Sequence, residues 1–136
     1  MKNNLFVIDT NTLISSSLFR YSMPREAERK ANETGKISAS IATYNEFFEV
    51  FLRSKFDKYI FRETRLEILK DFKQLAIFIK ISETITDCRD PKDNKFLELA
   101  VSSNASCIIT GDKDLLILHP FRGIPILNAV DFINDF

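Results

Sequence analysis

The feature that most limits the fold of this chain is a short apolar run that ends on an acid. Leu5-Phe6-Val7-Ile8 has no polar residue to face water, and Asp9 follows at once. Such a strand is buried on both faces, which is typical of the centre of a parallel sheet covered by helices. A second run, Cys107-Ile108-Ile109-Thr110, leads through Gly111 to Asp112. The sequence therefore predicts two buried strands, each ending near an aspartate.

Helical and strand patterns alternate along the rest of the chain. We expect further strands at residues 36–39, 76–81 and 124–127, and helices at residues 10–19, 25–33, 41–53, 62–75 and 90–103 and at the C-terminus. Ser40 is the expected N-cap of the third helix, and Gly35 ends the second. Alternation of this kind predicts an α/β fold, a three-layer α/β/α sandwich with a central, mainly parallel sheet. With 136 residues and no repeat or linker, residues 1–136 are expected to form a single domain.

Composition excludes several classes of protein. A single histidine, His119, excludes a multi-histidine zinc site, and Cys88 and Cys107 make neither a disulfide framework nor a paired zinc motif. No apolar run is long enough to cross a bilayer, and no signal peptide is visible, so we expect a cytoplasmic protein that does not contact a membrane. The formal net charge is zero, so broad electrostatic attraction to nucleic acid is not expected.

Asp9 and Asp112 are candidate ligands for a cation because of where they stand. The carboxyl ends of parallel strands meet at one edge of a sheet, and ligands of α/β proteins bind there. Each acid alone could equally be a helix cap or a turn residue. Two strands that deliver an aspartate to the same edge describe a place where carboxylates can converge.

Asp93 gives a stronger argument. The positions three, four and seven residues further along its helix are Phe96, Leu97 and Ala100, so Asp93 lies on the apolar face. A buried carboxylate is costly unless it is paired, and a bound cation removes the cost. The ordinary alternative is an acid favoured by the helix dipole. Clusters of Asp and Glu suit hard cations such as Mg²⁺ or Mn²⁺.

Glu46 and Glu49 are further candidates, and the residues do not choose between them. Periodicity places both away from the apolar face of their helix, and Glu49 can pair with Arg53 one turn on. The residues expected on that apolar face are Ile41, Tyr44, Phe48, Phe51 and Leu52.

The segment Asp9-Thr10-Asn11-Thr12 also begins like the Asp-x-Asp motif of phosphatases that use an aspartate nucleophile. Those enzymes have a second acid, which acts as general acid, at the position of Asn11. Its replacement by an amide argues against a phosphoryl-enzyme mechanism.

Three segments together resemble the signature segments of PIN domains. They are Val7-Ile8-Asp9-Thr10-Asn11-Thr12-Leu13-Ile14, Asp90-Pro91-Lys92-Asp93-Asn94-Lys95-Phe96-Leu97-Glu98-Leu99-Ala100 and Ile109-Thr110-Gly111-Asp112-Lys113-Asp114-Leu115. Their order and spacing are specific, although each alone is weak. The chain looks most like the toxin components of bacterial toxin–antitoxin systems that are related to VapC-type toxins.

This resemblance implies a Mg²⁺- or Mn²⁺-dependent endoribonuclease that hydrolyses phosphodiester bonds in RNA. It favours Glu46 over Glu49 and implies a catalytic set of Asp9, Glu46, Asp93 and Asp112. The metal ligands it implies are Asp9, Asp93, Asp112 and, in an assisting role, Asp114. Thr10, Asn11 and Thr110 would support these ligands or contact substrate phosphate.

The expected partners are an RNA substrate, a cognate antitoxin protein and a second copy of the chain. Arg20, Arg25, Arg29 and Lys30 are candidates for guiding the phosphate backbone, although solvated helix charges explain each more simply. Two other functions stay open, a non-catalytic module that binds a nucleotide or a protein and a metal-dependent phosphatase that acts on small esters.

Overall fold

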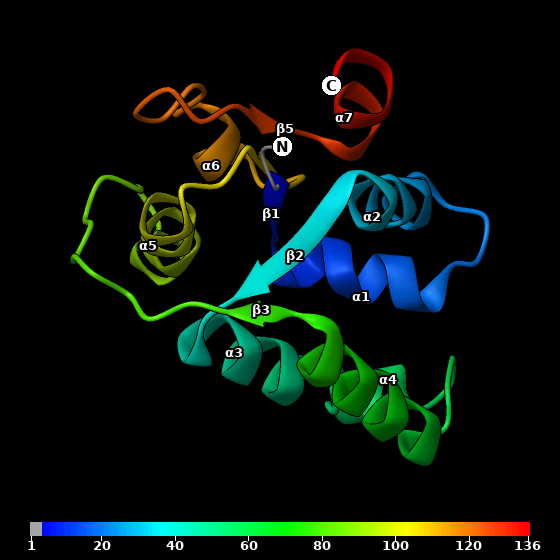
Figure 1. The fold of residues 1–136 in the computed structure, drawn as a ribbon. Coiled ribbons are helices and arrows are strands. Elements are labelled where there is room, and N and C mark those ends of the chain that lie inside the picture. The colour runs from blue at the N-terminus through cyan, green and yellow to red at the C-terminus, as the bar shows by residue number, and fades with distance from the viewer. Residues whose placement is uncertain (1–3) are drawn as a thin grey trace.

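The centre of the fold is a sheet of five parallel strands in the order β3-β2-β1-β4-β5, in a computed structural model that describes residues 4–136 (Figure 1). The strands are β1 (Asn4–Ile8), β2 (Gly35–Ala39), β3 (Ile77–Phe78), β4 (Cys107–Ile109) and β5 (Ile126–Leu127). The apolar run of β1 lies in the middle of the sheet, as predicted. It pairs with β2 on one side and with β4 on the other.

Seven helices and two short 3-10 turns connect the strands within residues 4–136. The helices are α1 (Thr10–Leu18), α2 (Met23–Thr34), α3 (Ile41–Phe51), α4 (Arg62–Leu75), α5 (Asn94–Ser103), α6 (Lys113–Leu116) and α7 (Ala129–Asp135), and the turns are η1 (Ser54–Phe56) and η2 (Pro91–Asp93). None of these helices has both the length and the apolar character that a membrane crossing requires.

Alternate side chains of the central strands enter two separate cores. Phe6 and Ile8 of β1 pack in one core with side chains of α1, α2, α3, α4 and α7. Val7 and Ile108 point to the opposite face and pack with side chains of α5 and α6. The sheet is therefore covered on both faces, which confirms the predicted three-layer α/β/α sandwich.

Glycine is required where α2 gives way to β2. A side-chain carbon built on Gly35 would lie 2.2 Å from the carbonyl oxygen of Asn4 on β1. The two strands can approach this closely only because Gly35 has no side chain. The predicted end of the second helix at Gly35 is confirmed, and the glycine is also the first residue of β2.

Two predicted elements differ from the structure. The strand expected at residues 76–81 is reduced to Ile77–Phe78, and both side chains are about two-fifths exposed because β3 is an edge strand that pairs with β2 alone. The helix expected at 90–103 begins as the turn η2, with Asp90 accepting a hydrogen bond from the Lys92 amide at 3.3 Å, and becomes α-helical only at Asn94.

The predicted apolar face of the helix that follows Ser40 was right for Phe51 and wrong for Ile41 and Phe48. Ser40 caps α3 through a reciprocal pair of hydrogen bonds with Thr43, and this fixes which side of the helix faces the sheet. The buried side chains are Thr43, Phe47 and Phe51, whereas Ile41 is 75% exposed and Phe48 is 40% exposed. The side of α3 that meets the rest of the protein is therefore the one that carries Thr43, Phe47 and Phe51.

A fully buried arginine holds the connection between α3 and α4. The Arg65 guanidinium donates hydrogen bonds to the carbonyl oxygens of Phe51 at 2.8 Å, Arg53 at 3.2 Å and Ile60 at 3.1 Å. It also forms an ion pair with Asp57. The Phe51 carbonyl stands at the end of α3, where it has no partner within the helix, and those of Arg53 and Ile60 belong to the α3–α4 connection.

We expect Arg65→Met to lower the free energy of unfolding by at least about 2 kcal/mol, because buried carbonyl groups lose their donors. Urea denaturation measures this difference. Arg62→Met on the same helix is the matched control, since Arg62 is exposed. Equal losses in the two variants would contradict a structural role for the buried guanidinium.

Candidate metal centre

The two strand-end aspartates meet at the carboxyl edge of the sheet, linked by a threonine. The Asp9 amide extends the β1–β4 ladder with a hydrogen bond of 3.2 Å to the Ile109 carbonyl. Thr110, which is fully buried, donates its hydroxyl to Asp9 Oδ2 at 2.5 Å and accepts the Asp112 amide at 2.9 Å. One hydroxyl therefore fixes the positions of both acids.

Each of these aspartates is also a helix cap, the alternative that the sequence left open. Asp9 Oδ1 accepts the amide of Thr12 at 3.0 Å, and Asp112 Oδ1 accepts the amide of Asp114 at 2.8 Å. Capping uses only one carboxylate oxygen of each residue. A role as cap and a role as ligand are therefore compatible.

Asp93 reaches the same edge from the other face of the sheet. It is 8% exposed and lies beside the buried Phe96, Leu97 and Ala100, as the helical spacing predicted. No hydrogen-bond donor of the described residues 4–136 reaches its buried Oδ2 atom. Burial and the neighbouring Asp112 carboxylate raise the pKa of Asp93 to about 7. Burial also raises the pKa of Asp9.

Glu46 completes the group from α3. Its side chain is 22% exposed, next to the buried face of the helix, and accepts the Thr10 hydroxyl at 2.5 Å. Its second oxygen forms an ion pair with Lys95 of α5. Glu49 is 74% exposed and pairs with Arg53 at 3.3 Å, which is the surface role that its spacing suggested.

The four acids open into one cleft of about 460 Å³. Three basic residues and two further acids, Glu49 and Asp90, line the same cleft, and Asn11 in its lining is exposed. The lining residues are Asp9, Thr10, Asn11, Glu46, Glu49, Val50, Arg53, Lys55, Asp90, Lys92, Asp93, Phe96 and Asp112. The cleft is thus lined by both acidic and basic side chains.

Asp114 lies outside this lining. Its carboxylate accepts two hydrogen bonds from Arg89, at 2.6 and 3.0 Å, and the pair joins the loop before η2 to α6. His119 is also remote, because its Nδ1 accepts the Ile126 amide at 2.9 Å near β5.

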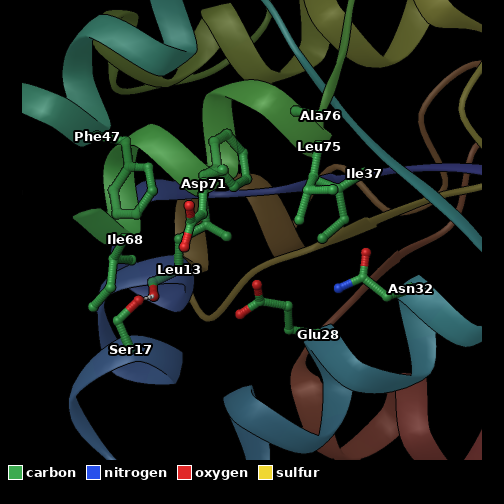
Figure 2. Close-up of a pocket in the computed structure, with 11 residues that line it drawn as sticks. Leu13, Ser17, Glu28, Asn32, Ile37, Phe47, Ile68, Asp71, Leu75 and Ala76 are labelled. Atoms are coloured by element: carbon green, nitrogen blue, oxygen red, sulfur yellow. Dashed lines mark hydrogen bonds between the residues drawn. The ribbon is translucent and has the colours of Figure 1, made fainter. Parts of the chain in front are cut away.

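A smaller hollow of about 190 Å³ lies between α1, α2 and α4 (Figure 2). Its walls include Leu13, Phe47 and Ile68, with Glu28 and Asp71 nearby. None of the four clustered acids lines it. The chemistry of the larger cleft therefore marks the candidate site.

The cleft residues fit a hard divalent cation by their chemistry. All four candidate ligands offer carboxylate oxygens, which Mg²⁺ and Mn²⁺ prefer, and the buried Oδ2 of Asp93 needs a positive partner. Within residues 4–136, no three acidic, histidine or cysteine side chains already stand close enough to hold an ion. Thr10 and Lys95 occupy the two carboxylate oxygens of Glu46, and Thr110 occupies Oδ2 of Asp9. These carboxylates would have to turn towards a bound cation.

Lys95 and the basic residues of the cleft were missed by sequence reasoning. Lys95 lies within the segment Asp90–Ala100 that resembles PIN domains, but its contact with Glu46 spans 49 positions and has no local signal. Two of the basic candidates that the sequence offered have other partners. Lys30 donates to the carbonyl oxygens of Phe132 and Ile133 at the end of α7, and Arg29 pairs with Glu26.

Comparison with known proteins places this geometry in a family. Residues 6–114 match the family model described as PIN domain. The chain is also 36% identical over 120 residues to the uncharacterized protein MJ1680 of Methanocaldococcus jannaschii. This match covers 83% of this chain and 74% of that protein.

Two solved structures share the fold. PAE2754 from Pyrobaculum aerophilum superposes with a TM-score of 0.62 at 14% identity, covering 97% of this chain and 91% of the other. VapBC2 from Rickettsia felis, bound to a DNA fragment from its promoter, superposes with a TM-score of 0.57 at 17% identity, covering 91% and 98%. At these identities the likeness concerns the fold alone.

Because the pKa of Asp93 is raised in the folded protein, ionisation of this carboxyl group lowers the free energy of unfolding when no metal is bound. The folded-state pKa of about 7 exceeds the ordinary 3.8, so folding takes up a proton between these values and stability falls as pH rises through them. In EDTA at pH 8, we expect Asp93→Asn to raise the melting temperature by at least about 4 °C. Calorimetry at pH 8 and pH 5 should show a smaller gain at pH 5.

Asp87→Asn is the matched control, because Asp87 is an exposed acid in the loop before η2. A gain that is equal at both pH values, or equal in the two variants, would contradict this account of Asp93.

Proposed function

The chain belongs to the PIN-domain family, and from this we propose that it is a Mg²⁺- or Mn²⁺-dependent endoribonuclease. The observation that carries the proposal is the convergence of four carboxylates in one cleft, one of them the buried Asp93 with an unpartnered oxygen. RNA as the substrate is supported by the family, and a hard cation by the all-oxygen ligand set.

Asp9, Glu46, Asp93 and Asp112 are the proposed cation ligands and catalytic residues. These residues would hold the cation, which when bound would supply a Lewis acid to neutralise charge on the phosphoryl oxygens and to activate water. No histidine is needed as a base, and His119 lies elsewhere.

The remaining polar residues orient these acids. Thr110 holds Asp9 and the Asp112 backbone, Thr10 and Lys95 hold Glu46, and Asn11 at the cleft edge is the proposed contact for substrate phosphate. Asp114, which the resemblance implied as an assisting metal ligand, lies outside the cleft lining, and we propose that it instead supports the site by pairing with Arg89 and holding α6 next to the loop before η2.

A cognate antitoxin and a second copy of the chain are the proposed protein partners. Support for the antitoxin comes from the shared fold with VapBC2 of Rickettsia felis, which was solved bound to a DNA fragment from its promoter. Exposed apolar side chains such as Ile41 on α3 and Leu75 on α4 are compatible with self-association. We propose that the protein acts in the cytoplasm.

We expect the purified protein to cleave labelled RNA in the presence of Mn²⁺ or Mg²⁺ and to be inactive in EDTA. Asp9→Asn and Asp112→Asn should each reduce the rate by more than about a hundredfold, since loss of a metal-site residue exceeds the effect of its supporting residues. Asparagine keeps the helix caps, so the loss would not reflect unfolding. Gel analysis of the products measures the rate.

Glu46→Gln and Glu49→Gln form a matched pair for the glutamate. The proposal requires a large loss with Glu46→Gln and little change with Glu49→Gln. Equal cleavage by the wild-type protein and both aspartate variants would point to a contaminating nuclease and overturn the assignment.

Cation binding can be tested without catalysis. At a concentration a hundredfold above its dissociation constant, Mn²⁺ should stabilise the folded protein by about 2.7 kcal/mol. Asp112→Asn should lose most of this gain, whereas Asp135→Asn at the exposed end of α7 should keep it. Differential scanning fluorimetry measures the shift.

The two rival functions give different results. A non-catalytic binding module would show little stabilisation by Mn²⁺ and no metal-dependent cleavage. A phosphatase would be stabilised by Mn²⁺ and would hydrolyse small phosphate esters, but it would leave RNA intact.

A further inference from the structure

The cleft continues beyond the acids towards the far end of α3. Two basic residues line the same cleft as Asp9 and Asp112. They are Arg53, which directly precedes η1, and Lys55 on η1. A polyanion with one phosphate at the acids could therefore reach these two cations without leaving the cleft. The acids repel phosphate in the absence of a cation, so positive side chains are needed alongside them.

An exposed segment rich in basic and aromatic side chains follows η1. Tyr59 is 53% exposed, with the Lys58 ammonium 5.2 Å from its ring, and Phe61 is 79% exposed. The Lys55 ammonium lies 5.1 Å from the ring of Phe56. Aromatic rings left open to solvent beside cations offer stacking surfaces for nucleobases.

Further basic and aromatic residues, at the end of α1, lie beside this segment. The rings of Phe19 and Tyr59 are in edge-to-face contact at 6.2 Å, although they are 40 positions apart in the chain. Tyr21 is 91% exposed and the Arg20 guanidinium lies 5.9 Å from its ring. In Figure 1 the α1–α2 connection and the α3–α4 connection lie on the same side of the molecule.

This surface is positive although the whole chain is neutral. Asp57 is the only acid between Arg53 and Arg62, and its carboxylate is engaged by the buried Arg65. No acid occurs between Ser17 and Arg25. Arg53 pairs with Glu49 at 3.3 Å, whereas Arg20, Lys55 and Lys58 form no ion pair with the described residues 4–136.

We propose that Arg20, Tyr21, Lys55, Lys58 and Tyr59 form a basic–aromatic surface that binds single-stranded RNA leading into the acidic cleft. This inference rests on the proposed function, because the acids define where the strand is cut. The ten residue steps from Asp9 to Phe19 along α1 correspond to about 15 Å, so the part of the surface at the end of α1 begins roughly this far from the acidic cleft.

Single-stranded RNA fits this surface better than a duplex or a protein. Bases must be unstacked to lie on Tyr21 and Tyr59, and only a single strand offers them. A protein interface favours a mainly apolar centre with few charges. Here each exposed tyrosine has a cation beside it.

The test measures binding in EDTA, where the proposed cleavage cannot occur. Fluorescence anisotropy would compare a labelled single-stranded RNA with a duplex RNA of equal length over a range of salt concentrations. The variants are Lys55→Gln/Lys58→Gln and Tyr59→Leu. The matched controls are Lys36→Gln/Lys70→Gln, which removes two exposed charges far from the cleft, and Phe78→Leu, which removes another exposed ring.

We expect the double lysine variant to reduce the salt dependence of single-strand binding by about 1.4 in the logarithmic slope, because two phosphate contacts are lost. Tyr59→Leu should weaken single-strand binding at least about fivefold and leave duplex binding unchanged, since it removes one stacking contact. Both controls should bind RNA as the wild-type protein does.

Three results would overturn the proposal. They are equal affinity of wild type and variants for the single strand, tighter binding of the duplex by the wild-type protein, and a dimer that Tyr59→Leu dissociates while RNA binding is unchanged. The last result would assign the surface to a second copy of the chain.

The Mn²⁺-induced rise in melting temperature should be unchanged in the surface variants. Intact single-strand binding combined with no Mn²⁺-dependent cleavage would overturn the proposed function and leave the binding surface in place. Metal-dependent cleavage with unaltered binding by the variants would overturn only the surface.

Discussion

Pairing between β1 and β4 in the middle of the sheet is the contact on which the candidate site depends. Both strands are buried on both faces, so neither can shift by one residue without moving apolar side chains to the wrong core. Their ends are therefore fixed relative to each other, and Thr110 transmits this to Asp9 and Asp112 through two hydrogen bonds. The packing of β1 and β4 in the two cores therefore fixes the relative positions of Asp9 and Asp112.

Gathering carboxylates at this edge has an energetic cost that the protein offsets within the site. Thr110 donates to Asp9, Lys95 neutralises Glu46, and Asp93, for which no such donor is found in residues 4–136, instead has its pKa raised to about 7. A site that gathers four acids, of which only Glu46 pairs with a cation among the described residues, is less stable than an apolar one would be. Such local destabilisation is typical of functional sites.

Local patterns predicted the parts of the fold that depend on neighbours in sequence. The apolar runs gave β1 and β4, the spacing from Asp93 to Phe96 gave its inward position, and Ser40 gave the start of α3. Phe51 was correctly expected on the buried face of α3, but Ile41 and Phe48 were not, because both are apolar yet exposed and hydrophobicity alone did not identify the side that meets the sheet. The PIN-domain resemblance, not periodicity, favoured Glu46.

Contacts between distant positions could not be predicted, and Arg65 shows how much follows from one of them. Its guanidinium satisfies the end of α3 and engages Asp57, the one acid of the exposed 53–62 segment. The buried Arg65 thus holds the α3–α4 connection in place. It also engages the one acid of that segment, so the exposed lysines there have no acidic partner within the segment. A chain with zero net charge can in this way present a local positive surface beside an acidic cleft, because burial decides which charges reach a polyanion. Net charge therefore describes this protein less well than the partners of each charged side chain do.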